Sequence, residues 1–397
     1  MAGICYIAPD VEVPYHKGSS THVLELARAF AQLGHKVHVI SRRGNLAPEM
    51  ENIDGVSVHR IYRGIISPVR RRNGVAYGTQ SEGGSGFLGK AYHLYLESCF
   101  ALYAAIVASR IIQTYSLDVI IERETAFGAG ALASKMCNIP MVLEMIGPRY
   151  SNLSMRTCSK VFAYNERMLP RGAMEKVVFV KAAVNPGLFR PDREAGRAVR
   201  NQLALNGAFT VGYVGSFLDW HGVDDLLDAA AVIIKQSSGV KFVFVGPYTK
   251  EFTESVAKRE LSDAVRVVGP VPYDQVPPYI NACDILVAPY NITGTSRSTK
   301  GIGSPLKVLE YMACGKPTIG SALPQVADLV KDGMTGLLFP QGDSHSLARC
   351  IMLLANDPGM RQQLGDQALA SVTGRYTWSI LATEIASILD EIRAFHD

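Results

Sequence analysis

The sequence lacks several features that would assign a chemistry at once. Its seven cysteines are odd in number and scattered, without C-x-x-C or Cys/His ligand spacing, which predicts a reducing compartment, no disulfide framework and no zinc site. No G-x-G-x-x-G follows a predicted strand, so a dinucleotide cofactor is not expected. The sequence has no Asp-x-Asp motif, and its formal net charge of +4 is too small to indicate nucleic-acid binding. We therefore expect neither a cofactor nor a bound metal ion.

The sequence also lacks a recognisable targeting segment. Residues 1–9 form a short apolar strand without the basic and long apolar regions of a signal peptide. The longest apolar run, residues 92–112, nearly reaches the length of a membrane span. It carries His93, Glu97 and Arg110, so we interpret it as a buried or interfacial helix. These observations predict a cytoplasmic protein, with the inner face of a membrane as a second location.

The first half of the chain begins with a βαβ pattern. A strand at residues 3–8, a helix at 21–33 and a strand at 36–41 imply a parallel sheet, whose ligands bind at the carboxyl ends of the strands. A glycine-rich segment, residues 62–90, contains the basic run 69–72. Its arginines form either a solvated face or a contact for an anionic acceptor or a membrane.

The same alternation restarts after a polar, proline-punctuated stretch at residues 186–205, which we interpret as a linker. A chain of 397 residues exceeds one ordinary core, so we expect two domains, with three as an alternative. Two consecutive α/β halves predict two doubly wound sheets facing across a cleft. The predicted parts are an N-terminal domain at 1–190, a linker at 191–206, a C-terminal domain at 207–375 and a final helix at 376–397.

One short helix, within residues 303–317, organises the second half. Ser304 is the expected N-cap and Pro305 the first helical residue, because serine and proline favour these positions. A helix start after a flexible loop presents free N–H groups and a positive dipole end, which together bind anions. Lys307 adds a cation there, and Glu310 can accept hydrogen bonds from sugar hydroxyls. The alternative is an ordinary capped helix.

Five blocks of sequence in the second half resemble the retaining glycosyltransferases of family 4. They are V-G-S-F-L-D-W-H-G-V (214–223), F-V-G-P (244–247), V-G-P-V-P-Y-D-Q-V-P-P-Y-I-N-A-C-D-I-L-V-A-P (268–289), S-P-L-K-V-L-E-Y-M-A-C-G-K-P (304–317) and D-G-M-T-G-L-L-F-P (332–340). The first half is similar through G-S-S-T-H-V-L-E-L-A-R-A-F-A-Q-L-G-H-K-V-H-V and N-P-G-L-F-R-P. The resemblance implies the GT-B architecture of two Rossmann-like domains, with a nucleotide sugar bound by the C-terminal domain and the acceptor by the N-terminal domain.

The resemblance also implies residue roles on the donor side. Glu310 would hold the ribose hydroxyls, because a carboxylate can accept two of them. Gly18 would let the backbone approach the phosphates closely. The diphosphate would be cradled by Gly303, Ser304, Pro305 and Leu306, and the base would lie against Pro270 and Val271. The loop after the first C-terminal strand would contribute Gly215 and Ser216.

Several positions depart from the family pattern. The first acid of the paired-glutamate motif, eight residues before Glu310, is Ile302. The arginine and lysine of the loop G-R-x-x-x-x-K-G are replaced by Ser216 and His221. Because the leaving diphosphate needs stabilisation, another cation must supply the charge. The candidates are Lys307, Lys300, Arg297 and a protonated His221.

The resemblance implies sugar transfer with retention through an oxocarbenium-like transition state, without a metal ion. The catalytic candidates are Lys307, Glu310, His221 and Arg123, the last replacing a family histidine. The acceptor-side candidates are Lys17, His22, Glu124 and Glu144. We expect the acceptor to be a small molecule, a glycan or a lipid-linked molecule. The sequence leaves the nucleotide, the sugar and the oligomeric state open. A sugar-nucleotide epimerase of the same architecture and a non-catalytic sugar-nucleotide-binding partner are the alternatives, the latter motivated by the missing acid and cations.

Overall fold

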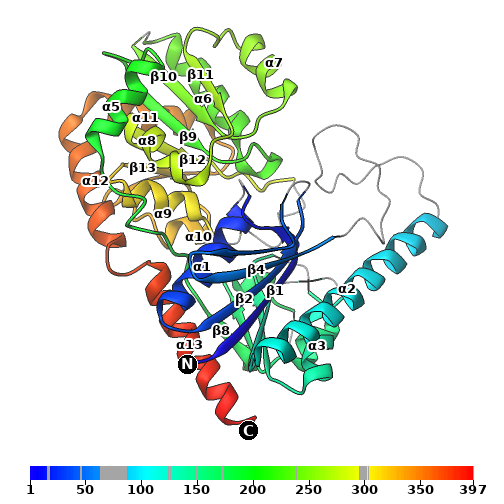
Figure 1. Ribbon diagram of the computed structural model, residues 1–397. Helices are drawn as coiled ribbons and strands as arrows, with labels where there is room; N and C mark the ends of the chain where they lie inside the picture. The colour runs from blue at the N-terminus through cyan, green and yellow to red at the C-terminus, as the bar shows by residue number, and fades with distance from the viewer. Residues whose placement is uncertain are drawn as a thin grey trace.

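The computed structural model describes residues 1–15, 18–44, 47–62, 87–123, 125, 127–147, 150–170, 174–237, 239–294, 302 and 304–396. The chain forms two sheets covered by helices (Figure 1). The first sheet has the order β3-β4-β2-β1-β5-β6-β7-β8, and the second has the order β11-β10-β9-β12-β13-β14. All neighbouring strands are parallel except β3 and β4. The predicted α/β class with two Rossmann-like sheets is confirmed.

The elements of the first half are β1 (Gly3–Glu12), α1 (Gly18–Gln32), β2 (Lys36–Arg42), β3 (Met50–Ile53), β4 (Val56–Ile61), α2 (Phe87–Tyr115), β5 (Val119–Arg123), α3 (Ala129–Cys137), β6 (Met141–Met145), α4 (Asn152–Thr157), β7 (Lys160–Ala163), η1 (Glu166–Met168), η2 (Met174–Lys176) and β8 (Val177–Phe179). Those of the second half are α5 (Arg193–Gln202), β9 (Phe209–Val214), η3 (Asp219–His221), α6 (Val223–Ile234), β10 (Val240–Val245), α7 (Lys250–Lys258), β11 (Val265–Gly269), η4 (Tyr273–Gln275), α8 (Val276–Ala282), β12 (Ile285–Ala288), α9 (Leu306–Ala313), β13 (Thr318–Ser321), α10 (Pro324–Ala327), β14 (Gly336–Phe339), α11 (Ser344–Asn356), α12 (Pro358–Val372) and α13 (Trp378–Ala394).

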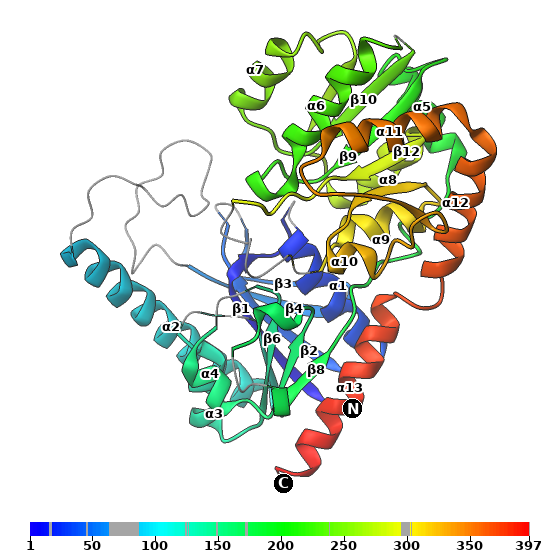
Figure 2. The ribbon, with the colours of Figure 1, turned by 180° about the vertical axis from the view of Figure 1, so that it is seen from behind.

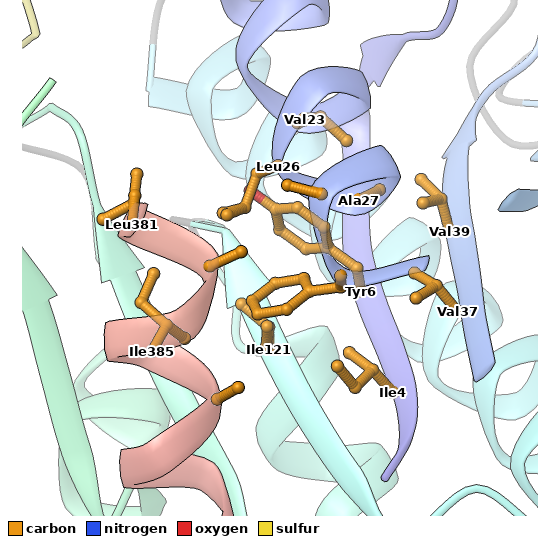
Figure 3. Packing of buried hydrophobic residues seen from close by; sticks show 14 of the residues in the cluster. Ile4, Tyr6, Val23, Leu26, Ala27, Val37, Val39, Ile121, Leu381 and Ile385 are labelled. Carbon is orange, nitrogen blue, oxygen red and sulfur yellow. The ribbon is translucent and has the colours of Figure 1, made fainter. Parts of the chain in front are cut away.

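The last helix, α13, belongs to the core of the first sheet. Parallel strands are buried on both faces, and β1 accordingly buries every residue from Gly3 to Pro9. On one face, Leu26 of α1 packs beside Leu381 and Ile385 of α13 (Figure 3). Seen from behind, α13 runs along the first sheet after the chain has left the second (Figure 2). The chain therefore crosses back between its two halves.

The other face of the first sheet is covered by α2. The apolar side of this helix, including Phe100, Ala104 and Ala108, packs against Cys5 and Ile120 of the sheet. The segment Leu94–Tyr115 is long and apolar enough to cross a membrane by length and composition alone, and 44% of its most apolar window is buried inside the protein. Such helices are also common in protein cores, so the expectation of a buried or interfacial helix stays a prediction.

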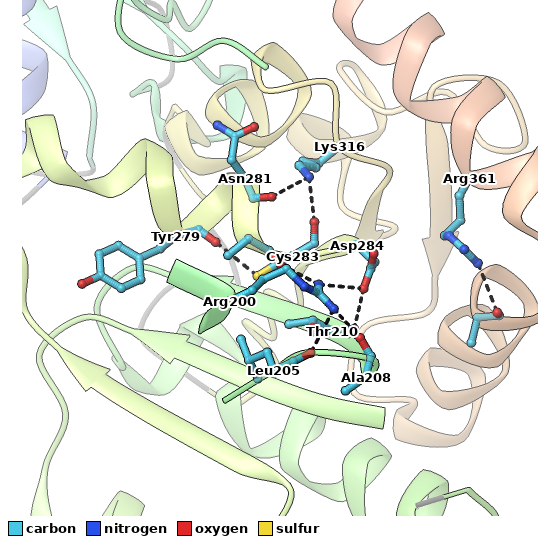
Figure 4. A network of polar contacts seen from close by, with 12 residues as sticks. Arg200, Leu205, Ala208, Thr210, Tyr279, Asn281, Cys283, Asp284, Lys316 and Arg361 are labelled. Carbon is cyan, nitrogen blue, oxygen red and sulfur yellow. Dashed lines mark hydrogen bonds and ion pairs between the residues drawn. The ribbon is translucent and has the colours of Figure 1, made fainter. Parts of the chain in front are cut away.

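The stretch predicted to be a linker contains a helix, α5. Asp192 caps this helix by accepting a hydrogen bond from the backbone N–H of Ala195. Near its end, Arg200 donates to the carbonyl oxygens of Leu205, Ala208 and Ala282, which fixes α5 to the segments that lead into β9 and β12 (Figure 4). The predicted domain boundaries at 190, 206 and 375 stay a prediction.

Candidate active site

The site lies where the starts of α1 and α9 approach each other between the two sheets. A Cβ atom added to Gly18, the first residue of α1, would lie 3.9 Å from Cδ1 of Leu306, the first residue of α9. Asn165, just after β7, donates from Nδ2 to the carbonyl oxygen of Ile302 at 3.2 Å. The two helix starts therefore share one interface, as expected for a ligand held by both halves.

The start of α9 differs from the prediction by one residue. Pro305 is the N-cap, with φ −83° and ψ 66°, and Leu306 is the first helical residue. No side chain caps the helix, so Ser304 is not the N-cap. The N–H of Leu306 donates to the carbonyl oxygen of Ser304, and the buried Oγ of Ser304 has no hydrogen-bond partner among the described residues. A hydroxyl group and a helix start thus remain available to a ligand.

Glu310 lies buried on the second turn of α9. The hydroxyl of Tyr273, from η4, donates to its Oε1 at 3.1 Å, whereas Oε2 accepts no hydrogen bond from the described residues. Burial raises the pKa of Glu310 to about 7, although the Tyr273 hydrogen bond and the charge of Lys307 oppose this rise. One carboxylate oxygen is therefore oriented by the protein and the other is open to a ligand.

Lys307 is also buried, one turn before Glu310. Its Nζ donates to the hydroxyl of Tyr213 at 3.0 Å and lies 4.4 Å and 5.0 Å from the ring centroids of Tyr213 and Tyr290. Burial lowers the pKa of Lys307 to about 7. An ammonium group has three donors, and Tyr213 takes one of them. The other two make no hydrogen bond to any described residue.

Gly215 makes room for this lysine in the loop after β9. Its φ is 148°, and a Cβ atom there would lie 2.8 Å from Nζ of Lys307. The hydroxyl of Tyr213 donates to the carbonyl oxygen of Ser216, the next residue, at 2.6 Å. The ammonium group therefore lies directly beneath the loop in which the family pattern has its cations.

His221 closes the same loop. Its Nδ1 donates to the carbonyl oxygen of Ser216 in a short hydrogen bond and lies 3.3 Å from Oγ of that serine. The ring packs against Trp220, with centroids 3.9 Å apart, and against Tyr290 at 5.6 Å. These contacts give His221 a role in holding the loop. A charge on this histidine stays a prediction.

Pro270 and Val271 form the short turn between β11 and η4. Pro270 is exposed, whereas Val271 is half-buried against the core of the second domain. The turn leads directly into Tyr273, so the residues predicted to meet the base are joined to the residue that holds Glu310.

A second polar cluster surrounds Glu144 at the carboxyl ends of the first sheet's strands. The hydroxyl of Tyr6 donates to its Oε2 in a short hydrogen bond, and Nε2 of His22 lies 2.7 Å from its Oε1. Tyr164 donates to Oε1 at 3.5 Å, and Arg123 pairs with Oε2 at 3.6 Å. Burial alone would raise the pKa of Glu144, but His22, Arg123 and Tyr6 outweigh it and hold the pKa below its ordinary value.

Burial lowers the pKa of His22, although the charge of Glu144 and its hydrogen bond oppose this shift. Its ring lies between Tyr164 and Trp378, at centroid distances of 5.5 Å and 5.1 Å, and its Nδ1 has no hydrogen-bond partner among the described residues. Both His22 and Glu144 are almost completely buried. Their predicted contact with an acceptor stays a prediction, as does a catalytic role for Arg123.

Sequence reasoning missed the tyrosines of both clusters. Tyr6, Tyr164 and Tyr213 lie in or directly after strands, where their rings resemble ordinary core residues. The signal that could have found them is a phenol hydroxyl in a buried strand, because such a group requires a hydrogen-bond partner.

Some predicted positions lie outside the described residues. They are Lys17, Glu124, Gly303, the alternative cations Arg297 and Lys300, and the basic run 69–72. Within the described ranges, no three His, Cys, Asp or Glu side chains come together in a way that could hold a metal ion.

Comparison with known proteins identifies the chain as a glycosyltransferase. The family described as "Glycosyl transferases group 1" matches residues 208–357, and "Glycosyltransferase Family 4" matches residues 16–145. The chain belongs to this group 1, family 4 class of glycosyltransferases.

Curated relatives are distant in sequence. An uncharacterized glycosyltransferase of Methanocaldococcus jannaschii is 22% identical over 97% of this chain and 98% of its own. A D-inositol 3-phosphate glycosyltransferase of Streptosporangium roseum is 25% identical over 94% of this chain and 87% of its own. The alpha-D-kanosaminyltransferase of Streptomyces kanamyceticus is 26% identical, but over only 51% of this chain and 50% of its own.

Solved structures share the fold over the whole chain. Sucrose-phosphate synthase from Thermosynechococcus elongatus superimposes with a TM-score of 0.76 at 18% identity, covering 99% of this chain and 100% of its own. HepE of Anabaena, in complex with UDP-glucose, gives 0.74 at 18% identity, covering 98% and 100%. The predicted GT-B architecture is therefore confirmed.

Proposed function

We propose that this glycosyltransferase moves a hexose-type sugar, with retention, from a UDP- or GDP-sugar to a hydroxyl group or another nucleophile of an acceptor. The proposal rests on two side chains in the first two turns of α9. An open carboxylate oxygen on Glu310 and a buried ammonium group on Lys307 lie on one short helix that faces the start of α1. The solved complexes of HepE with UDP and UDP-glucose make UDP the first nucleotide to test.

The proposed chemistry follows from these groups. Glu310 accepts hydrogen bonds from the ribose, and the start of α9 with Lys307 stabilises the diphosphate as the glycosidic bond breaks. The acceptor hydroxyl attacks the anomeric carbon of an oxocarbenium-like sugar, and its proton passes to the departing phosphate. No metal ion is required for these steps, because the helix start and the ammonium group supply the positive charge.

We further propose that the acceptor side works at a cytoplasmic membrane surface, on a small, glycan or lipid-linked acceptor. The support is on α2, whose outer end extends from the body of the protein (Figure 1). Tyr92, Leu94, Tyr95 and Leu102 of this helix are each at least half exposed, and tyrosine suits the interface between water and lipid.

The donor site is tested by thermal-shift measurements with UDP, GDP, ADP and TDP. A ligand at a hundred times its Kd adds about 2.7 kcal/mol to the stability of the folded state. We expect one nucleotide to raise the midpoint for the wild type and to leave Glu310→Ala unchanged. Glu254→Ala, at an exposed glutamate of α7, is the matched control and should respond like the wild type. A wild type that responds to none of the four nucleotides would contradict the proposal.

A further inference from the structure

Tyr273 connects two parts of the proposed donor site that the chain makes separately. It begins η4, directly after the turn formed by Pro270 and Val271. Its hydroxyl donates to Oε1 of Glu310 at 3.1 Å, and its ring packs against Phe189 with centroids 5.2 Å apart. One side chain thus joins the turn predicted to meet the base to the carboxylate predicted to meet the ribose.

We propose that Tyr273 is a positioning residue for the donor: its hydroxyl fixes Oε1 of Glu310, so that Oε2 is directed at the ribose hydroxyls. The inference rests on the proposed function, because it presumes that the nucleotide sugar binds at Glu310. Tyr273 itself contacts the carboxylate and not the reacting atoms.

Among the described residues, Tyr273 is the neighbour that donates a hydrogen bond to the carboxylate of Glu310. Lys307, on the same helix, directs its Nζ to Tyr213 at 3.0 Å rather than to the carboxylate. Across the interface, Glu25 of α1 brings a second negative charge toward Glu310. A repelling charge on one side and a diverted cation on the other leave the Tyr273 hydroxyl as the group that orients the carboxylate.

Glu25 is itself fixed in place. Its Oε1 pairs with Arg28 at 2.7 Å, and its Oε2 accepts a hydrogen bond from Nδ2 of Asn185 at 3.0 Å. Both carboxylate oxygens of Glu25 are therefore occupied, which holds its charge near Glu310, although the paired Arg28 offsets part of that charge.

The same bond controls the ionisation of Glu310. Burial and the charge of Glu25 raise the pKa of Glu310, the Tyr273 hydrogen bond and Lys307 oppose the rise, and the resulting pKa is about 7. Removing the Tyr273 hydroxyl therefore moves this pKa upward. A larger fraction of Glu310 is then protonated near neutral pH, and a protonated carboxyl group accepts fewer hydrogen bonds.

The experiment compares UDP with 2′,3′-dideoxy-UDP, which lacks the hydroxyls that Glu310 would bind. Calorimetry gives the Kd of each nucleotide between about pH 6 and pH 9 for the wild type and Tyr273→Phe. We expect the variant to bind UDP about tenfold more weakly at pH 7, because a smaller fraction of Glu310 is then ionised and correctly oriented for the ribose hydroxyls. Dideoxy-UDP should lose less than about twofold.

The Kd of dideoxy-UDP divided by the Kd of UDP isolates the contribution of the ribose hydroxyls, because both nucleotides carry the same phosphates for Lys307 to bind. In the wild type this ratio should rise with pH as Glu310 ionises, and in Tyr273→Phe the rise should move to higher pH. Tyr279→Phe is the matched control, because the Tyr279 hydroxyl makes no hydrogen bond to any described residue. It should leave both Kd values unchanged.

Each outcome separates this inference from the proposed function. Equal weakening of both nucleotides by Tyr273→Phe would give Tyr273 a general structural role and overturn the inference. A wild type that does not distinguish UDP from dideoxy-UDP would instead overturn the ribose site at Glu310. Glu310→Gln completes a double-mutant cycle. Adding Tyr273→Phe to this variant should not change the ratio of the dideoxy-UDP Kd to the UDP Kd any further. If GDP is the nucleotide that stabilises the protein, GDP and dideoxy-GDP replace the uridine pair.

Discussion

Replacing Lys307 by methionine should stabilise the empty protein at acidic pH and weaken its hold on the nucleotide. Burial lowers the pKa of Lys307 from 10.5 to about 7. Because the unfolded chain binds this proton more tightly than the folded protein does, the folded state gains stability as pH rises from about 7 to 10.5. Below about pH 7, the wild type therefore carries the full destabilising effect of the buried Lys307 charge. Methionine keeps the unbranched shape of the side chain and removes the buried charge.

The magnitude follows from the pKa. One pKa unit corresponds to about 1.4 kcal/mol, so the full effect of Lys307 is on the order of 5 kcal/mol. For a domain of 150 to 250 residues, each kcal/mol moves Tm by about 2–4 °C, which gives roughly 10–20 °C. Binding should change in the opposite direction. A lost hydrogen bond from a charged group to phosphate costs about 1.5–3 kcal/mol, or roughly ten- to a hundredfold in Kd.

The assay measures Tm of the wild type and Lys307→Met by calorimetry at pH 6 and pH 10, with and without UDP. The variant should exceed the wild type by several degrees at pH 6 and match it at pH 10. Lys250→Met is the control, because Lys250 is 84% exposed on α7 and should show no such dependence on pH. Identical pH dependence for Lys307→Met and wild type, or unchanged UDP affinity, would refute the reasoning.

Two further substitutions test how the site and the core are held. Gly215→Ala places a methyl group 2.8 Å from Nζ of Lys307 at a φ of 148°, so it should cost about 1–3 kcal/mol in unfolding free energy and weaken UDP binding. Gly207→Ala, at a φ of 77° with nothing within 4 Å, carries backbone strain alone and should bind UDP normally in the same titration. Trp378→Ala should cost about 3–5 kcal/mol, because this side chain is 4% exposed against the first sheet. Denaturant unfolding checks it, and a loss below about 1 kcal/mol would show that α13 is only loosely attached.

The arrangement of the sheets was predictable because buried parallel strands are continuous apolar runs. β1 and β2 begin at their predicted starts, residues 3 and 36, because each is a largely apolar run. The edge strand β3, Met50–Ile53, was missed because it is largely exposed and has no apolar run. The helix α5 was missed for a similar reason, as only Gly196 and Val199 of its residues are buried.

The candidate site was predictable only where one segment contains it. Lys307 and Glu310 lie three residues apart on α9, so their shared surface follows from helical spacing. Their partners come from elsewhere in the chain: Tyr273 is 37 residues from Glu310, and Tyr213 is 94 residues from Lys307. Such pairs depend on how α9 packs against the strands and loops of the second sheet, which a hydrophobic pattern does not specify. The helix start was misplaced by one residue because Ser304 hydrogen-bonds through its carbonyl oxygen instead of its hydroxyl.

The return of α13 to the first sheet constrains how the protein forms during synthesis. The ribosome releases all eight strands of the first sheet long before it makes Leu381 and Ile385, which complete one face of that sheet's core. Until then, the apolar side of α1 that α13 covers is exposed, and such exposed apolar surface favours aggregation. The second sheet, although made later, can finish its own packing first. In this chain the N-terminal half is therefore the last to become fully folded.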